Sequence, residues 1–544
     1  MEIVNLSLPA TNKFATAYYN GSQDIQQYFH YNYQNAAHFE ERLTELAGRT
    51  FMRNELAEHI EAFMKPFPTS EKVSESLEKL KDEKSVVVIG GQQAGILTGP
   101  LYSIHKVISI IALAKQKEKE LGIPVVPVFW IAGEDHDYAE VNHVYVQNEN
   151  ELEKWVYPEK VIDKRMVTDC IINKEICLSW IQSIVENFGE TDYTNLLVDR
   201  AKKAIDSSET FVDFFSYIIM DLFKEQGLLL IDSGNRQLRK LEKEILTEQI
   251  KESVRITTAV LEQQDILAKA DFHKTIELST NAANIFYYDE IHYERILLEF
   301  DKDSQTYLGK DGSISFTKDE LLSIASEHPE RLSNNVVTRP LMQESLFPTL
   351  AFIAGPGEIS YWAELKKAFE EFDMKMPPII PRINITLLER DIESDLEQLE
   401  LNLEQVLQKG LLEEKEAFVE SVKDKSMELL FEETKQQLMK SYQLIEEKTN
   451  IDYKGLLPLL KKNEGLLLNQ LQFMEGKFEE ALRLKHDVRL RQYDRIENSL
   501  RPSGGPQERI WNIYYFLNKY GYDFVENLMK LTFEFDGKHK VVKI

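Results

Sequence analysis

Apolar runs alternate with helical patterns along the first part of the chain. Residues 85–106 begin with the β-branched run SVVVI, continue through a glycine-rich loop and reach Pro100, where a helical pattern starts. Such a run predicts a buried strand, a loop and a helix in succession. The helix is expected to extend to Leu121, before Gly122, and a second strand is expected at 123–133. This βαβ unit predicts a parallel sheet with a right-handed crossover.

Two later stretches repeat this order of apolar strand, polar loop and helix. Residues 227–246 contain a strand and a cap-forming turn before a helix, and residues 348–372 contain a strand, the loop 355–358 and a helix. A proline-bearing strand follows at 376–388. Open parallel sheets bind ligands outside the carboxyl ends of their strands, so both glycine loops are expected to face one cleft. A tight turn without a ligand is the alternative for the second loop.

After residue 388 the composition shifts to Leu, Glu, Lys and Gln. Apolar residues step by three and four along two runs, Leu388, Ile392, Leu396, Leu399, Leu403 and Val406, then Leu467, Leu471, Met474, Phe478 and Leu482. This spacing predicts long helices packed as a coiled coil, either as architecture or as a dimer seam.

The α/β chain is therefore divided into a first core part with a helical N-terminal cap (1–144), a helical insertion (145–226), a core strand-helix unit (227–250), a small α+β insertion (251–335), a second core part (336–388), an α-helical coiled coil (389–500) and a helical tail (501–544).

Composition and charge disfavour some classes of binding partner. The chain has 544 residues and a formal net charge of -27, which disfavours nucleic acid or an anionic membrane as the main partner. Cys170 and Cys177 lie outside any CxxC spacing, so neither a disulfide framework nor a zinc ribbon is expected. The N-terminus lacks a signal-peptide pattern, and no apolar run is long enough to span a membrane. A cytoplasmic protein is the simplest expectation.

Ionisable residues gather where the first two predicted strands end. Asp135, His136 and Asp137 follow the second strand, and such a cluster is costly beside a core unless it faces a polar cleft. A solvated loop is the alternative, and no metal site is expected because adjacent residues cannot all converge on one ion. His105 lies in the second turn of the first helix, where it is either functional or a satisfied residue at the edge of the core.

The first glycine loop matches neither common nucleotide-binding motif. No Gly-Lys-Ser/Thr follows it, and Gln92 occupies the place of the middle glycine of GxGxxG. The loop can instead bring its backbone close to a ligand, and a helix N-terminus beside it favours a carboxylate or phosphate. The hydrogen-bonding and glycine positions that we expect to contact this ligand are Gln92, Gln93, Gly95, Thr98 and Gly99.

The tail offers a second place for an anion. Arg501, Ser503, Gly504 and Gly505 precede an aromatic helix and can cradle a phosphate, with Trp511 as a stacking surface. A plain loop followed by a packing helix is the alternative.

Five motifs carry a family resemblance over essentially the whole chain. The segments GGQQAGILTGPLYSIHK, PVFWIAGEDHD, LLLIDSG, IAGPGEISYWAEL and ERIWN, in this order, resemble the bacillithiol-synthesis cysteine-adding enzymes, also called cysteine ligases. The resemblance implies a Rossmann-like core similar to the nucleotidyltransferase superfamily, two insertions and a coiled coil that joins two subunits. It also implies a nucleotide site for ATP or ADP near the coiled coil and tail. Within the motifs, the resemblance adds Tyr102, Lys106, Tyr361 and Trp362 to the substrate site and Arg509 and Asn512 to the nucleotide site.

The reaction that the resemblance implies is amide formation between cysteine and the amino group of glucosaminyl-malate. His105 or His136 is the candidate base, oriented by Asp135 or Asp137. Gln92, Gln93, Thr98 and the loop of Gly355, Pro356, Gly357 and Glu358 are expected to hold the malate carboxylates or the activated acyl group. Two alternatives stay open, a coiled-coil dimer whose Rossmann-like lobe senses a nucleotide, and a nucleotidyltransferase acting on another acid.

Overall fold

A five-stranded parallel sheet forms the centre of the protein. The computed structural model describes residues 1–148, 151–310 and 312–544; residues 149 and 150, in the predicted helical insertion, and 311, in the predicted α+β insertion, lie outside the described residues. The strand order is β13-β12-β2-β3-β6, with every neighbouring pair parallel. The strands are Ile379–Pro381, Thr349–Ala354, Val86–Gln92, Val125–Ile131 and Leu229–Asp232. The predicted α/β class with a Rossmann-like core is confirmed.

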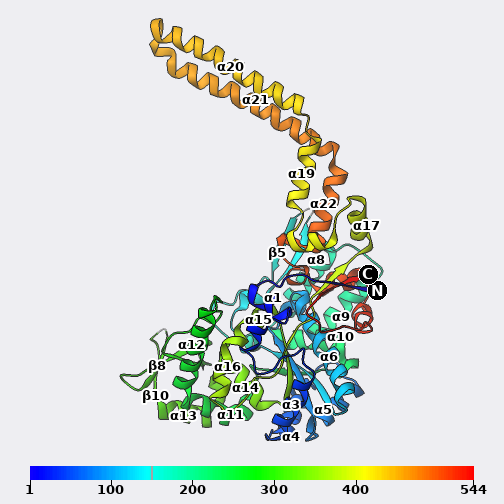
Figure 1. Cartoon of the computed structure of the whole chain (residues 1–544), viewed down its shortest axis with the longest axis vertical. Coiled ribbons are helices and arrows are strands. Elements are labelled where there is room, and N and C mark those ends of the chain that lie inside the picture. The colour runs from blue at the N-terminus through cyan, green and yellow to red at the C-terminus, as the bar shows by residue number, and fades with distance from the viewer. Residues whose placement is uncertain (149–150, 311) are drawn as a thin grey trace. The chain divides into compact units, whose positions relative to one another are not determined.

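Helices cover this sheet. Every residue of β3 is buried, as expected for a parallel strand in the middle of a sheet whose faces are both covered. Helix α6 (Leu101–Leu121) packs on β2 and β3 and ends at Gly122, whose φ of 66° is left-handed. Figure 1 shows α3 (Ala37–Ala47), α4 (Arg53–Met64) and α5 (Glu71–Lys81), which contact the strands β12, β6 and β3. Helices α1 (Lys13–Tyr19) and α2 (Gln23–Gln26) precede them.

The two insertions differ from each other in architecture. The first begins with the hairpin β4–β5 (His143–Asn148 and Glu151–Val156), so its predicted all-helical character is wrong there. The alternating pattern HVYV explains the hairpin, and helices α8, α9 and α10 (Lys174–Asn187, Thr194–Asp206 and Phe211–Phe223) follow. The second insertion contains an antiparallel sheet of order β10-β9-β8-β7-β11. Its elements are α12 (Ser253–Lys269), β7 (Ala282–Asp289), β8 (Glu294–Asp301), β9 (Thr306–Gly309), β10 (Ser315–Thr317), α13 (Lys318–Glu327) and β11 (Leu332–Asn334). The core helices before and after it in the chain are α11 (Arg236–Lys251), α14 (Thr338–Leu346), α15 (Pro356–Trp362) and α16 (Lys366–Glu370).

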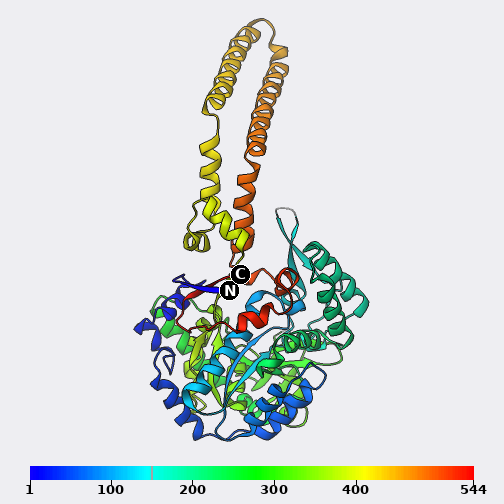
Figure 2. The same ribbon diagram turned by 90° about the vertical axis from the view of Figure 1, so that its right-hand side faces the viewer.

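The two ends of the chain meet in a small sheet that was not predicted. Strand β15 (His539–Lys543) pairs antiparallel with β1 (Glu2–Leu6) and parallel with β14 (Ile385–Leu388). Figure 2 shows the N- and C-termini close together. The tail, expected to be helical, therefore has only the two helices α23 (Ile513–Tyr520) and α24 (Phe524–Met529) before this strand. Short strands that pair with residues far away in sequence have little local periodicity, so the sequence pattern does not predict this sheet.

The chain forms two compact units, one of Met1–Leu388 with Gly505–Ile544 and one of Glu389–Gly504. In the second unit α20 (Lys425–Asp452) and α21 (Leu457–Lys485) lie side by side as a hairpin, seen in both Figure 1 and Figure 2. Its other helices are α17 (Arg390–Gln398), α18 (Leu403–Lys409), α19 (Leu412–Val422) and α22 (Asp487–Leu500). The first predicted apolar run does not form one helix, because Leu388 belongs to β14 and Glu400 has a left-handed φ of 55°.

No helix among the described residues is both long enough and apolar enough to cross a membrane.

Close backbone approach at Gly91 yields a stability prediction. A Cβ at this position would lie 2.7 Å from the carbonyl oxygen of Trp130 in β3, whereas a Cβ at Gly357 would meet no atom within 4 Å. Gly91→Ala is therefore expected to lower the free energy of unfolding by about 1–3 kcal/mol. Gly357→Ala, inside α15, is expected to be neutral or stabilising by about 0.5–1 kcal/mol.

Urea unfolding followed by tryptophan fluorescence measures both variants. Equal midpoints for Gly91→Ala and the parent chain would contradict the tight strand packing.

Candidate functional site

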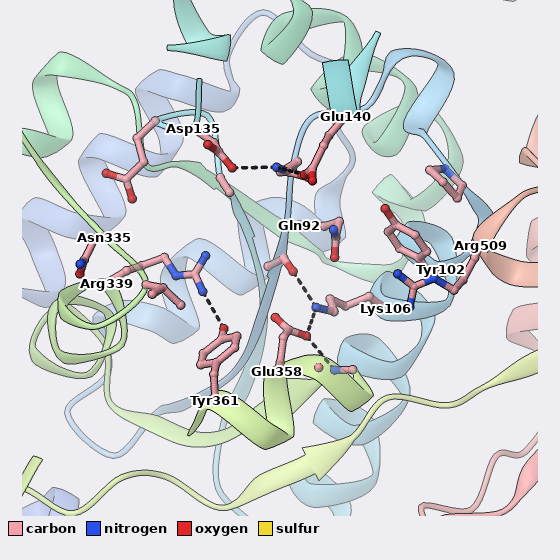
Figure 3. A pocket seen from close by; sticks show the side chains of 18 of the residues that line it. Gln92, Tyr102, Lys106, Asp135, Glu140, Asn335, Arg339, Glu358, Tyr361 and Arg509 are labelled. Carbon is pink, nitrogen blue, oxygen red and sulfur yellow. Dashed lines mark hydrogen bonds and ion pairs between the residues drawn. The ribbon is translucent and has the colours of Figure 1, made fainter. Parts of the chain in front are cut away.

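A cavity of about 830 Å³ opens at the carboxyl ends of the central strands. It lies wholly within the unit of Met1–Leu388 and Gly505–Ile544. Its walls come from the loop after β2, the end of β3, the start of α15, the second insertion and the tail segment 508–509 (Figure 3). Its position agrees with the predicted cleft between the two glycine loops.

The cavity is much less acidic than the chain as a whole. Five cationic side chains line it, together with five carboxylates, whereas the whole chain has 64 Lys and Arg against 91 Asp and Glu. The cations are Lys106, Arg295, Arg339, Arg382 and Arg509, and the carboxylates are Glu134, Asp135, Glu140, Glu358 and Glu508. A site of this composition suits a ligand that carries several anionic groups.

A buried ion pair links the two predicted loops. Nζ of Lys106, from α6, lies 2.5 Å from Oε2 of Glu358 in α15 and donates to the carbonyl of Gly91 at 2.7 Å (Figure 3). Glu358 also accepts a hydrogen bond from the backbone N–H of Gly355 at 2.7 Å. Burial lowers the pKa of Lys106, and Glu358 opposes this shift. The first and second glycine loops are thus fixed relative to each other beneath the cavity.

The cluster after β3 faces the cavity through Asp135 and His136. Asp135 accepts hydrogen bonds from Nε2 of Gln93 at 2.7 Å and from the backbone N–H of His136 at 2.8 Å. Burial would raise the pKa of Asp135, but Arg295 and these hydrogen bonds lower it below its usual value. Asp137 is exposed and lies outside the cavity lining, so it does not orient a catalytic histidine there.

The partner of His136 fixes the position of its proton. Nη1 of Arg295 lies 3.3 Å from Nδ1 of His136, and Nδ1 must accept because arginine only donates. Burial and the charge of Arg295 lower the pKa of His136. With Nδ1 facing Arg295, the neutral ring has its Nε2–H available as a hydrogen-bond donor toward a ligand. The role of His136 as the base stays a prediction.

His105 lies behind the cavity wall and not on it. It is 1 % exposed, does not line the cavity, and its Nδ1 is 3.1 Å from Oε2 of Glu508. The same carboxylate accepts from Nη2 of Arg382 at 2.5 Å. Burial alone would raise the pKa of Glu508, but Arg382 and His105 outweigh it and lower the pKa to about 2. His105 therefore positions a carboxylate, and its predicted role as a base in contact with substrate is wrong.

The other predicted substrate residues fall into two groups. Gln92, Gln93, Tyr102, Lys106, Gly355, Pro356, Gly357, Glu358 and Tyr361 line the cavity. Gly95, Thr98, Gly99 and Trp362 do not, since Thr98 is fully buried and Trp362 packs against Phe352 with ring centroids 4.6 Å apart. These residues shape the loop and the core beneath the site.

The predicted nucleotide residues of the tail are divided between the two units. Arg501 donates to the carbonyls of Leu407, Gln408 and Gly504 within the second unit, with Ser503 and Gly504 beside it. Gly505 begins the last segment of the first unit, where Arg509 lines the cavity and Trp511 packs against Tyr515 with ring centroids 4.6 Å apart. Asn512 is buried and donates to the carbonyls of Leu97 and Gly99 at 2.8 and 2.7 Å, bracing the first glycine loop.

Several cavity residues were missed because no local pattern marks them, among them three arginines and an asparagine. Arg295, Arg339 and Arg382 are single arginines on β8, on α14 and after β13, and Asn334 ends β11. Glu508 lies in the motif ERIWN but was not singled out. The available signal was a few arginines in a very acidic chain, with no shared place in the predicted elements. Among the described residues, no group of three or more His, Cys, Asp or Glu side chains is arranged to hold a metal ion.

The fold is that of an α/β protein with a Rossmann-like core, and its cavity is lined by equal numbers of Lys or Arg and of Asp or Glu side chains. Residues 1–383 match the family model for the bacillithiol biosynthesis BshC N-terminal Rossmann-like domain, and residues 385–544 match that for the BshC C-terminal coiled-coil domain. The chain belongs to the bacillithiol biosynthesis BshC family.

Full-length relatives agree with this assignment. Proteins named "Putative cysteine ligase BshC" are 45% identical in Geobacillus sp. strain WCH70 and 44% identical in Geobacillus thermodenitrificans, over 544 residues and 100% of both chains. A protein of the same name in Bacillus cereus is 39% identical over 545 residues, again across 100% of both chains.

The buried Glu508 carboxylate gives a pH-dependent prediction. Because its pKa is lowered to about 2, it stabilises the fold above the pKa of an unfolded glutamate, and this contribution is lost as pH falls toward 2. Glu508→Gln is expected to reduce the free energy of unfolding at pH 7 by roughly 3 kcal/mol. The difference from the parent chain should shrink between pH 4.5 and 3.

Urea titrations at pH 7, 5, 4 and 3 measure this difference. The control is Glu78→Gln, because Glu78 is 73% exposed and pairs only with Lys81, so little change is expected at any pH. A Glu508→Gln effect of equal size at pH 7 and pH 3 would exclude the ionised pair as its cause.

Proposed function

We propose that this protein is a ligase that joins the carboxyl group of cysteine to the amino group of glucosaminyl-malate, the step that yields bacillithiol. The observation that carries the proposal is the cavity with five cationic side chains in a chain of net charge -27. Its size lies within the range of sites for small ligands. Membership of the BshC family and the names of the full-length relatives support the cysteine-adding step. Two buried free cysteines fit a reducing cytoplasm.

The chemistry needs an activated carboxyl group, and we propose ATP as its source. The carboxylate of cysteine attacks a phosphorus atom of ATP and displaces ADP or pyrophosphate, which gives a cysteinyl phosphate or adenylate. The amine nitrogen then attacks its acyl carbon, the C–N bond forms, and the C–O bond to the phosphate or AMP leaving group breaks. Tyr102 and Arg509 share one part of the cavity in Figure 3, and the arginine has no hydrogen-bond or ion-pair partner among the described residues. A free guanidinium suits a phosphate group. ATP would thus be a substrate at the main cavity.

Asp135 and His136 are placed to assist the attack. The nitrogen becomes cationic and acidic once the C–N bond forms, so the ionised carboxylate of Asp135 can accept its proton. The Nε2–H of His136 donates to the oxygen on which negative charge develops. Arg295 keeps this proton on Nε2 by occupying Nδ1. The roles of histidine and aspartate are therefore the reverse of those expected from sequence.

Removal of either group is expected to slow the chemical step. His136→Ala and Asp135→Asn should each lower kcat by about 10²–10³, because one lost charge-stabilising donor or one lost proton acceptor has an effect of this size. The matched control is His292→Ala, since His292 is 73% exposed and bonds only Asp289. Bacillithiol formation is followed by mass spectrometry with cysteine, glucosaminyl-malate and ATP, each also omitted in turn.

Leaving out cysteine, glucosaminyl-malate or ATP in turn distinguishes the proposed ligase from a nucleotide sensor and from a nucleotidyltransferase. A nucleotide sensor would bind ATP or ADP without consuming cysteine, and a nucleotidyltransferase for another acid would release pyrophosphate only with that acid. Wild-type rates in both His136→Ala and Asp135→Asn would reject the assigned roles.

We further propose that two copies of the chain associate through α20 and α21. No residue of either helix is buried, although the rings of Phe431 and Phe478 pack at 5.6 Å between them. Large apolar side chains recur at multiples of seven residues on both helices, and each of them is more than half exposed. They are Leu430 (55%), Leu444 (59%) and Ile451 (76%) on α20, and Leu459 (64%), Leu466 (53%) and Phe473 (56%) on α21. This repeat forms an apolar stripe on each helix that a second copy can cover.

Charges on the stripe should separate the two copies. The double variant Leu444→Glu/Leu466→Glu is expected to sediment as a monomer at concentrations where the parent chain is a dimer, because each carboxylate would be buried without a partner. Gln436→Lys is the control, since Gln436 bonds Glu432 outside the seven-residue repeat. A parent chain that sediments as a monomer would reject the dimer.

A further inference from the structure

One wall of the cavity contains buried polar atoms without a hydrogen-bond partner. Asn334 lines the cavity and is 2 % exposed, yet neither its side-chain nitrogen nor its oxygen has a partner among the described residues. Nε of Arg339, on the same wall, is also buried and unpaired. A buried polar group without a partner is destabilising, and native proteins keep few of them. Two such residues in the lining of one cavity point to a ligand that pairs with both.

Both residues are held rigidly by groups around them. The backbone N–H of Asn334 donates to Oε2 of Glu134 at 3.2 Å, and its carbonyl accepts from Nη2 of Arg295 at 2.6 Å. Nη2 of Arg339 donates to the hydroxyl of Tyr361 at 2.7 Å. Figure 3 shows the guanidinium of Arg339 extending from α14 toward the interior of the cavity above Tyr361. The wall is therefore organised before a ligand arrives, which lowers the entropy cost of binding.

The unpaired side-chain atoms of Asn334 and Arg339 indicate which chemical groups a ligand of this wall should carry. A guanidinium with an unpaired N–H edge matches a carboxylate, which accepts two parallel hydrogen bonds. A side-chain amide offers one acceptor and two donors, and its natural partner is a hydroxyl group, which both donates and accepts. The apolar side chains of Phe286, Leu297 and Val336 line the cavity nearby and suit the C–H face of a sugar ring. The ligand should thus carry a carboxylate and a sugar hydroxyl together.

We propose that this wall orients glucosaminyl-malate, with a malate carboxylate on Arg339 and a sugar hydroxyl on Asn334. The assignment rests on the proposed function, because it names how that substrate lies in the cavity. It leaves the opposite side, with Tyr102 and Arg509, for the activated cysteine. Asn334 and Arg339 then select the acceptor substrate, and neither takes part in the bond-forming step.

Calorimetric titration of the full chain with two probes tests this orientation. Arg339→Lys keeps the charge but loses the planar fork, so affinities for glucosaminyl-malate and for malate alone should both fall about tenfold or more. Asn334→Ala should weaken glucosaminyl-malate about tenfold and leave malate unchanged, because malate lacks the sugar. Arg255→Lys is the control, since Arg255 is 62% exposed and pairs with Glu252 and Glu371.

Stability of the ligand-free protein distinguishes recognition from a structural role. Removal of an unpaired buried amide should leave the unfolding midpoint of Asn334→Ala unchanged or higher. A lower midpoint with unaltered affinity would instead assign Asn334 to the fold and overturn the proposal. Affinities of both variants within twofold of the parent chain, or no binding of glucosaminyl-malate by the parent chain, would also overturn it. Binding with the predicted pattern but no bacillithiol in the complete reaction would reject the proposed function and leave this subsite standing.

Discussion

A buried carboxylate near the end of the chain holds the cavity together. Glu508 pairs with Arg382, 126 residues before it, and with His105, 403 residues before it. Desolvating such a group is unfavourable, and only close partners on both of its oxygens make the ionised form stable there. Because these partners lie on different core elements, one carboxylate sets the distance between the first crossover helix and the last strands. The tail thus belongs structurally to the core, although the coiled coil separates them in sequence.

This arrangement explains which features were predictable from sequence. Strands β2 and β3 and helix α6 have strong local periodicity, and their predicted ends lie within three residues of the observed ones. Apolar runs and glycine loops also placed the cleft correctly. The arginines at 295, 339 and 382 carry no such pattern, because their meeting point is created by the packing of separate elements. For the same reason His105, near the loop in sequence, turned inward to a partner in the tail.

The tautomer of a histidine and the charge around a site depend on contacts between residues far apart in sequence, so sequence patterns do not predict them. His136 follows a strand end, as predicted, yet the arginine beside it decides which ring nitrogen bears the proton. The same holds for the electrostatic character of the site. A chain of net charge -27 would repel anions, but screening limits this repulsion to about 10 Å at 0.1 M salt. The five cations of the cavity lie beside five carboxylates, so an approaching acid meets a cavity of balanced charge and not the excess negative charge of the whole chain.

The central position of β15 between β1 and β14 has a consequence for how the protein is made. Strand β1 leaves the ribosome long before its partner residues 539–543. The segment that supplies Glu508 and the brace at Asn512 also emerges only after the whole coiled coil. A nascent chain can build the parallel sheet early, but its cavity stays incomplete until residues 508–512 have been synthesised. An unfinished copy of this protein therefore has a core and no working site.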